Sequence, residues 1–368
     1  MQPKPQPDFD QLRKVLLRQG EPDRLPFIEL FADREIMEAV IGEPIPTYEA
    51  FERDRQEIAL AHQIRFFYET GYDHVGIGAR VPMPRHRIAA SDTAALPRDQ
   101  RLWQDESQGV IETWQDFEQF PWPRPETIDF YPVEFVSRRL PDGMKMIFLG
   151  PGGQLENIMW LMGYMPMSYA LADDPALVQA VADKVGEMLV SVFSTAADVP
   201  GMGALWLGDD MGYKTATMIS PGMMRRYVFP WQKKLATIAH DHNLPFLLHS
   251  CGNLAAIMGD LIDDVGIDAR HSFEDTILPV TEAKKLYGDR VALLGGIDVD
   301  MLCRSTEAQV RAYTRRVIEA CAPGGGWALG TGNSVANYIP VRNYLAMLDE
   351  GRKYRAQGRY LYLPHGSS

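Results

Sequence analysis

Two side chains of the kind that bind metals follow a short apolar run in the second half of the chain. Residues 244–248 predict a buried strand, and His249 and Cys251 come directly after it, two positions apart. Alternate residues of a strand point to the same side, so the imidazole and the thiol can converge on one point. Both groups suit zinc, and the pair could form half of a zinc site. A structural role stays open, with His249 as a hydrogen-bonded interior residue and Cys251 as a small core residue.

Carboxylates follow another predicted strand, residues 204–207. Asp209 and Asp210 could supply a metal ligand, or one of them could be a general acid kept protonated by its neighbour. A turn or helix-capping role is the structural alternative for each. Further polar side chains at predicted strand ends complete the set of residues that could carry chemistry: Glu29, His74, Glu156, Asn157, His271, Glu274, Asp298, Thr331 and Asn333.

A cluster of basic side chains lies outside the regular alternation of strands and helices. Arg80, Arg85, His86 and Arg87 fall at the start of residues 80–132, a stretch with few apolar positions. The cluster could hold an anionic group of a substrate or a docking partner. A solvated surface is the bland alternative.

Eight apolar segments alternate with helical ones and must position these residues. The predicted strands lie near residues 25, 74, 146, 205, 247, 269, 293 and 328. This pattern predicts an α/β fold, a (β/α)8 TIM barrel forming a single domain over residues 1–368, with a tail and helix at 1–20. Residues 80–132 are interpreted as an insertion after the second strand. In such a barrel the functional groups gather at the carboxyl ends of the strands.

Composition narrows the classes of partner. A net charge of −12 argues against nucleic acid, because a polyanion would be repelled. The chain has only 3 scattered cysteines, which argues against a disulfide framework and favours a reducing, cytoplasmic setting. No apolar run reaches the roughly 18 residues that a membrane span needs. We therefore expect a small-molecule substrate.

An ordered set of motifs resembles the uroporphyrinogen decarboxylase superfamily, and most closely its zinc-dependent, corrinoid-linked methyltransferase branch. The resemblance runs from about residue 20 to residue 355 and implies a (β/α)8 barrel. Its motifs stand at residues 150–152, 173–175, 208–210, 220–221, 249–253, 294–298 and 330–333, with Pro340 and Asn343 beyond them.

The chain departs from the true decarboxylases of this superfamily at three places. Those enzymes carry arginines after the first strand, where this chain has Glu-Leu-Phe-Ala-Asp-Arg-Glu at 29–35. They also carry an aspartate after the second strand, absent from residues 76–80, and a histidine where this chain has Thr331. The resemblance therefore does not imply decarboxylation in the heme pathway.

The methyltransferase branch binds zinc through an H-x-C motif and a Cys after the eighth strand. His249 and Cys251 match the first motif, whereas Asn333 stands at the third position. We therefore expect the remaining ligands among other polar residues, with His271 and Glu274 preferred and Glu156, Asp209 or Asp210 left open. Catalytic roles are expected for Asp209, Asp210 and Glu156, and substrate contacts for Asn157, Arg80, His74 and Asn333.

The resemblance implies transfer of a methyl group from a methoxylated or methylated small molecule to a corrinoid cofactor or a thiol. Zinc would act as the Lewis acid, and a separate protein would carry the corrinoid. A homodimer is also expected. Two alternatives stay open: a decarboxylase acting on another carboxylate, porphyrinogen-like or not, and a non-catalytic barrel that binds a corrinoid or tetrapyrrole.

Overall fold

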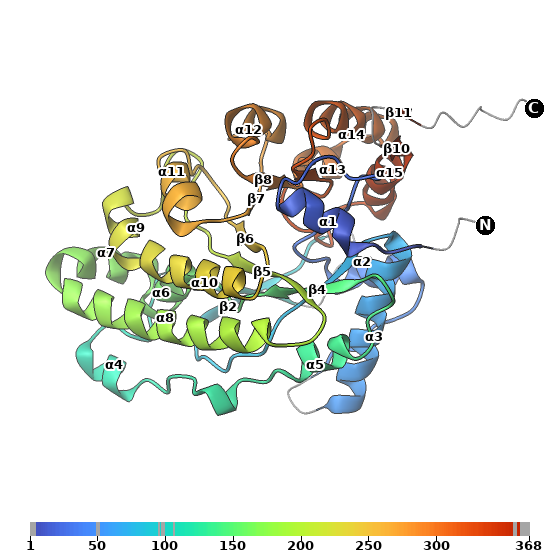
Figure 1. Cartoon of the computed structure of the whole chain (residues 1–368). Helices are drawn as coiled ribbons and strands as arrows, with labels where there is room; N and C mark the ends of the chain where they lie inside the picture. The colour runs from blue at the N-terminus through green and yellow to red at the C-terminus, as the bar shows by residue number, and fades with distance from the viewer. Residues whose placement is uncertain are drawn as a thin grey trace, which may run out of the picture.

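The computed structural model describes residues 5–48, 52–94, 96, 100–105, 107–355 and 359–360. Seven parallel strands form one sheet, which helices surround (Figure 1). The strands follow the order β1 (His74–Ile77), β4 (Lys145–Leu149), β5 (Met202–Gly208), β6 (Phe246–His249), β7 (Ala269–His271), β8 (Ala292–Leu294) and β9 (Trp327–Ala328). The predicted α/β class and these seven predicted strands are confirmed.

The predicted first strand, near residue 25, is reduced to isolated bridges. Phe27 pairs in parallel with Leu329, just past β9, and the Ile28 amide donates to the Leu329 carbonyl at 2.9 Å. Pro26 has no N–H group with which to extend a ladder. The segment still lies beside the last strand, so the sheet curls toward a barrel.

Helices fill the connections between the strands, as the sequence predicts. Their bounds are α1 (Phe9–Leu16), α2 (Arg34–Ile41), α3 (Arg53–Thr70), α5 (Tyr131–Ser137), α6 (Gln154–Met162), α7 (Tyr164–Asp173), α8 (Pro175–Ala197), α9 (Pro221–Tyr227), α10 (Phe229–Asp241), α11 (Met258–Asp260), α12 (Val280–Tyr287), α13 (Val299–Arg304), α14 (Glu307–Cys321) and α15 (Val341–Lys353). A π-helical turn, η2 (Leu261–Val265), follows α11. Among the described residues, no helix is both long enough and apolar enough to cross a bilayer.

The inside of the curled sheet has its own apolar layer, closed at one end by α1. Ile147, Trp206 and Leu247 face inward and pack with Leu12 and other buried residues of α1. A Cβ placed on Gly203, near the start of β5, would come within 2.5 Å of the α1 ring of Phe9. The helix therefore closes the amino-terminal end of the sheet and leaves the carboxyl ends of the strands for polar groups.

The segment between β1 and β4 lies near those carboxyl ends. It contains an antiparallel pair, β2 (Arg87–Ser91) and β3 (Gln100–Gln104), then α4 (Trp114–Gln119) and a 3-10 turn, η1 (Pro125–Thr127). The Asn337 amide, beyond β9, donates to the Asp92 carboxylate at 2.6 Å and so ties this segment to the last strand's loop. That the segment is an insertion stays a prediction.

Candidate metal centre

Three ligand-type side chains meet where β5 and β6 end. Gly208 pairs with His249 in the sheet, so the residues two positions further on, Asp210 and Cys251, also lie side by side. The Cys251 amide donates to Asp210 Oδ1 at 2.8 Å, and His249 Nε2 lies 3.5 Å from both Asp210 Oδ1 and Cys251 Sγ. One ligand atom from each residue lies within 4.8 Å of the other two. The predicted His249–Cys251 pair converges, and Asp210 joins it.

The hydrogen bonds behind His249 determine which of its nitrogens faces this cluster with a free lone pair. His271 is the ladder partner of His249, and its Nε2 lies 3.2 Å from the Thr331 carbonyl oxygen, which can only accept. His271 Nε2 therefore carries the proton, and burial keeps the pKa of this imidazole well below its ordinary value, so the ring is neutral and its Nδ1 is an acceptor. His249 Nδ1 lies 2.7 Å from that acceptor and must donate. In the neutral form of His249, the free lone pair is then on Nε2, inside the cluster.

A buried glutamate fixes the carbonyl on which this chain of hydrogen bonds depends. Glu29 accepts from the Thr331 amide at 2.8 Å and from the Thr331 hydroxyl at 2.7 Å. Burial raises the pKa of Glu29 to about 8 against the effect of these two hydrogen bonds. The Trp206 ring also meets His271 edge-on, with centroids 5.4 Å apart. The imidazoles of His249 and His271 are therefore held in place by buried groups on the side away from the cluster.

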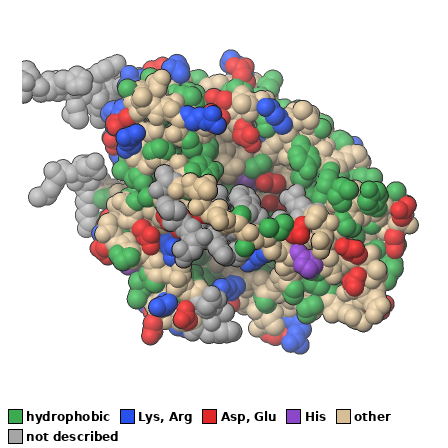
Figure 2. All heavy atoms as spheres, turned by 180° about the vertical axis from the view of Figure 1, so that it is seen from behind, with side chains coloured by type: hydrophobic (Ala, Val, Ile, Leu, Met, Phe, Trp, Pro, Cys, Tyr) green, Lys and Arg blue, Asp and Glu red, His purple; other side chains and the backbone are tan. Residues whose placement is uncertain are grey.

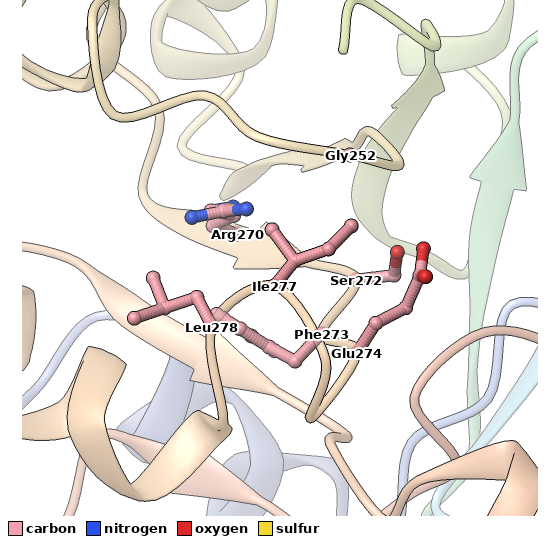
Figure 3. Close-up of a pocket in the computed structure, with 7 residues that line it drawn as sticks. All are labelled: Gly252, Arg270, Ser272, Phe273, Glu274, Ile277 and Leu278. Atoms are coloured by element: carbon pink, nitrogen blue, oxygen red, sulfur yellow. The ribbon is translucent and has the colours of Figure 1, made fainter. Parts of the chain in front are cut away.

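Both ring nitrogens of His271 are thus engaged, and the structure places it behind the cluster and not as a ligand. Glu274 also lies outside the three-residue cluster. Figure 3 shows the side chains of Ser272 and Glu274 on one side of their segment and Arg270 on the other. Ser272 Oγ lies 3.7 Å from Cys251 Sγ, so Glu274 faces the same region as the thiol without joining the ligand atoms.

Asn333 lies against the thiol and so occupies the neighbourhood of the family's third ligand. Its Nδ2 group donates to Cys251 Sγ at 3.2 Å. An amide hydrogen bond of this kind stabilises negative charge on sulfur. The structure therefore assigns Asn333 to the surroundings of Cys251, and its predicted contact with substrate stays untested.

Asp209 has a structural role, which corrects its predicted catalytic one. Its carboxylate accepts from the amides of Gln154, Leu155 and Glu156 and from Gln232 Nε2, at 2.7–3.2 Å, and the side chain is 0% exposed. Asp209 is therefore a cap for the positive end of α6, supplied from the neighbouring strand. Burial raises the pKa of Asp209 to about 6.

Glu156, by contrast, remains a candidate for proton transfer. It is half-buried in the first turn of α6, and its Oε2 accepts from the Gly153 amide at 3.1 Å. Burial first, and then the charges of Asp210 and Asp209, raise the pKa of Glu156 well above its ordinary value. This shift favours the protonated form of the carboxyl group, which lies beside the cluster of Asp210, His249 and Cys251.

Three predicted substrate-binding residues lie outside the cluster of Asp210, His249 and Cys251. His74 begins β1, at the opposite end of the strand, and is 0% exposed between the rings of Phe67 and Tyr72, so it is a core residue. The Arg80 side chain is exposed, and its backbone pairs with Asp129. Asn157 is 0% exposed and donates to the Gly153 carbonyl at 2.7 Å.

The sequence pattern does not indicate that Ser272 lies near the site. It also does not single out Arg85 from the neighbouring basic residues. Ser272 contacts Cys251 Sγ through a loop whose path no local pattern reveals. Arg85 reaches the first turn of α6, where its Nη2 donates to Asn157 Oδ1 at 2.8 Å. A search for basic residues near predicted strand ends finds Arg85 but ranks it no higher than Arg80 or Arg87.

The donor set fits zinc. An imidazole nitrogen, a sulfur and a carboxylate oxygen are all zinc ligands, and three protein ligands leave a fourth position open for a substrate. His249 Nε2 and Asp210 Oδ1 lie 3.5 Å apart, so a single cation can contact both atoms. Burial and the charge of Asp210 raise the pKa of the Cys251 thiol, so metal binding must release its proton.

Parallel strands curled around an apolar layer, with polar ligands gathered at their carboxyl ends, define the barrel-type class of α/β enzyme architecture. Within that class, residues 135–354 match the family described as "Uroporphyrinogen decarboxylase (URO-D)". The chain belongs to this family, whose members include both decarboxylases and methyltransferases.

Curated relatives carry both activities in their names. The chain is 28% identical over 187 residues to the uroporphyrinogen decarboxylase of Thioalkalivibrio sulfidiphilus, a match covering 50% of each protein. It is 29% identical over 140 residues to the methylcobamide:CoM methyltransferase MtaA of Methanosarcina barkeri, covering 38% of this chain and 39% of that one. The matches thus span half or less of these relatives.

A solved structure supports the fold over nearly the whole chain. A methyltransferase from Methanosarcina mazei superposes with a TM-score of 0.67 at 14% identity, covering 93% of this chain and 97% of that one. At this identity the likeness concerns the fold alone.

Proposed function

We propose that the protein is a zinc-dependent methyltransferase that moves a methyl group from a methoxylated or methylated small molecule to a corrinoid or a thiol. The observation that supports this best is the convergence of Asp210, His249 and Cys251 on one point. Curated relatives named as methyltransferases support it further.

The three residues would hold zinc through Oδ1, Nε2 and Sγ. Bound zinc would supply a Lewis acid at the oxygen or sulfur atom that carries the methyl group. Asn333 and Ser272 donate to Cys251 Sγ, and these hydrogen bonds would stabilise the thiolate that binds zinc. His271 keeps the Nε2 lone pair of His249 directed at the site.

Glu156 would complete the reaction by giving up its proton. When the bond between the methyl carbon and the donor oxygen breaks, the electron pair stays on oxygen while the carbon bonds to the acceptor. The oxygen then needs a proton, and the Glu156 carboxyl group, whose pKa is raised by burial and by the charge of Asp210, would supply it. A separate corrinoid protein as acceptor, and a homodimer, belong to this proposal.

A decarboxylase acting on another carboxylate is the second candidate, because several curated relatives carry that name. It needs no metal. The two candidates therefore differ in whether removing zinc abolishes activity.

The test compares two cysteine variants of the full chain. We expect Cys251→Ser to lose bound zinc and the transfer of methyl groups from a panel of aryl methyl ethers to cob(I)alamin. Cys303→Ser is the matched control, since Cys303 lies half-buried on α13, and it should keep both. Unchanged zinc content in Cys251→Ser, or turnover that survives full removal of zinc, contradicts the proposal.

A further inference from the structure

A positively charged side chain with no carboxylate partner lies beside the candidate metal centre. Arg85, between β1 and β2, is half-buried, and its Nη2 donates to the neutral amide of Asn157. Its Nε group has no hydrogen-bond partner, and no carboxylate of the described residues pairs with the guanidinium. Placing such a cation away from water without an anion is unfavourable, so the site lacks a negative partner.

Stacking and hydrogen-bonding contacts hold the guanidinium group of Arg85 in place. One face stacks on the Trp160 ring of α6, with Cζ 4.0 Å from the ring centroid. Asn157, which accepts from Arg85, is itself anchored to the Gly153 carbonyl. Gly152 leaves room for the indole, because a Cβ there would lie 2.3 Å from it. An arginine fixed in this way loses little conformational entropy when it binds a ligand.

Arg85 is also next to the reacting end of the site. Asn157, which accepts from Arg85, directly follows Glu156 on α6. Glu156 is in turn the electrostatic neighbour of Asp210 in the metal-type cluster. Figure 2 shows a hollow on this face, with acidic and histidine side chains inside it and basic side chains near its edge.

We propose that Arg85 binds an anionic group of the methylated substrate, a carboxylate, while the methyl-bearing atom faces Asp210, His249 and Cys251. The inference rests on the proposed methyltransferase function and narrows its substrates to those with a negatively charged end. The arrangement follows from charge. The stacked guanidinium offers a planar set of N–H donors that matches a carboxylate.

The test measures binding separately from turnover. Calorimetry on the zinc-loaded full chain compares para-methoxybenzoate with the neutral para-methylanisole, and para-methoxybenzenesulfonate distinguishes a carboxylate site from a general anion site. The variants are Arg85→Gln and Arg85→Lys, with Arg87→Gln as the control, because Arg87 is an exposed neighbour of the same charge.

We expect the wild-type protein to bind the carboxylate about tenfold or more tightly than the neutral ether, the range for a charge-assisted hydrogen bond. Arg85→Gln should lose that preference while its affinity for the neutral ether stays the same, and Arg87→Gln should keep it. Equal binding of both probes, no binding of the carboxylate to the wild type, or an unchanged preference in Arg85→Gln overturns the inference. A sulfonate bound as tightly as the carboxylate overturns the carboxylate assignment.

Failure of the two proposals can be told apart. If the Arg85-dependent preference is present but no methyl group reaches cob(I)alamin, the proposed function fails and the anion site stands. If methyl transfer occurs with the same kcat/KM for charged and neutral donors, the function stands and the role of Arg85 fails.

Discussion

At the scale of single residues, the site depends on which ring nitrogen of His249 carries the proton, and the sequence does not show this. The spacing of His249 and Cys251 predicts their convergence, because alternate strand residues share a face. It does not reveal that His271 and the Thr331 carbonyl determine which nitrogen of His249 is free. The spacing also does not show which of the two aspartates, Asp209 or Asp210, joins the cluster. Adjacent aspartates point in different directions, and only the strand register shows which one lies beside Cys251.

The role of His271 can be tested by replacing its acceptor nitrogen. His271→Phe leaves the Nδ1–H group of His249 without an acceptor, and we expect zinc affinity to fall by about 10- to 100-fold, as for other residues that orient a metal ligand. His271→Gln, whose amide oxygen can accept, should retain most of the affinity. Competition with a chromogenic chelator measures this.

Nitrogen-15 NMR of the metal-free protein provides a second measurement. We expect neutral His249 to carry its proton on Nδ1 in the wild type and to be a mixture of tautomers in His271→Phe. Zinc affinity unchanged in His271→Phe, or His249 protonated on Nε2 in the wild type, contradicts the assignment.

At the scale of elements, the carboxylate of Asp209 joins the end of β5 to the start of α6. The sequence predicts both the strand and the helix from their apolar patterns, but it cannot show that a residue after one caps the other. Gly153 makes the contact feasible, because a Cβ there would lie 2.1 Å from the Asp209 side chain. The position of Asp210 therefore depends on a glycine in a different loop.

Gly153→Ala should disturb both stability and the site. The added methyl group meets a side chain fixed by four hydrogen bonds, and we expect the free energy of unfolding to fall by about 1–3 kcal/mol. Zinc affinity should fall with it, because Asp210 follows the displaced Asp209. Urea denaturation and a zinc titration measure the two effects.

Gly259→Ala is the control for this substitution, since a Cβ at Gly259 meets nothing within 4 Å. It should leave stability within about 0.5 kcal/mol of the wild type. If Gly153→Ala behaves like this control, the helix–strand coupling is wrong.

At the scale of the whole molecule, the fold separates an apolar end, closed by α1, from a polar end where the strands finish. Apolar runs and glycines predict the α/β class and the seven ladder strands. The first strand was overpredicted because Pro26 interrupts its hydrogen bonding. His74 was misplaced for a similar reason: the sequence shows that a strand is present but not at which residue it begins.

The buried Glu29 should make the stability of the whole protein depend on pH. Its pKa is raised from 4.5 to about 8 in the folded state, so the unfolded chain releases this proton first as the pH rises. The free energy of unfolding should therefore fall between pH 4.5 and 8. Between pH 6 and 8, where Asp209 contributes little, Glu29 accounts for about 1.4 kcal/mol per pH unit.

Glu29→Gln keeps an acceptor for Thr331 and removes the titrating proton. Guanidinium denaturation of the two proteins at pH 6 and pH 8 should show a smaller loss in the variant, by about 2 kcal/mol. An exposed substitution, Glu282→Gln on α12, should follow the wild type. Parallel behaviour of wild type and Glu29→Gln would show that Glu29 is ionised in the fold.

The most direct test of the central claim is anomalous diffraction at the zinc absorption edge from crystals of the zinc-loaded full chain. We expect one strong peak within about 2.0–2.3 Å of Asp210 Oδ1, His249 Nε2 and Cys251 Sγ. A zinc peak coordinated by other residues, or no peak at this point in protein that retains zinc, would contradict it.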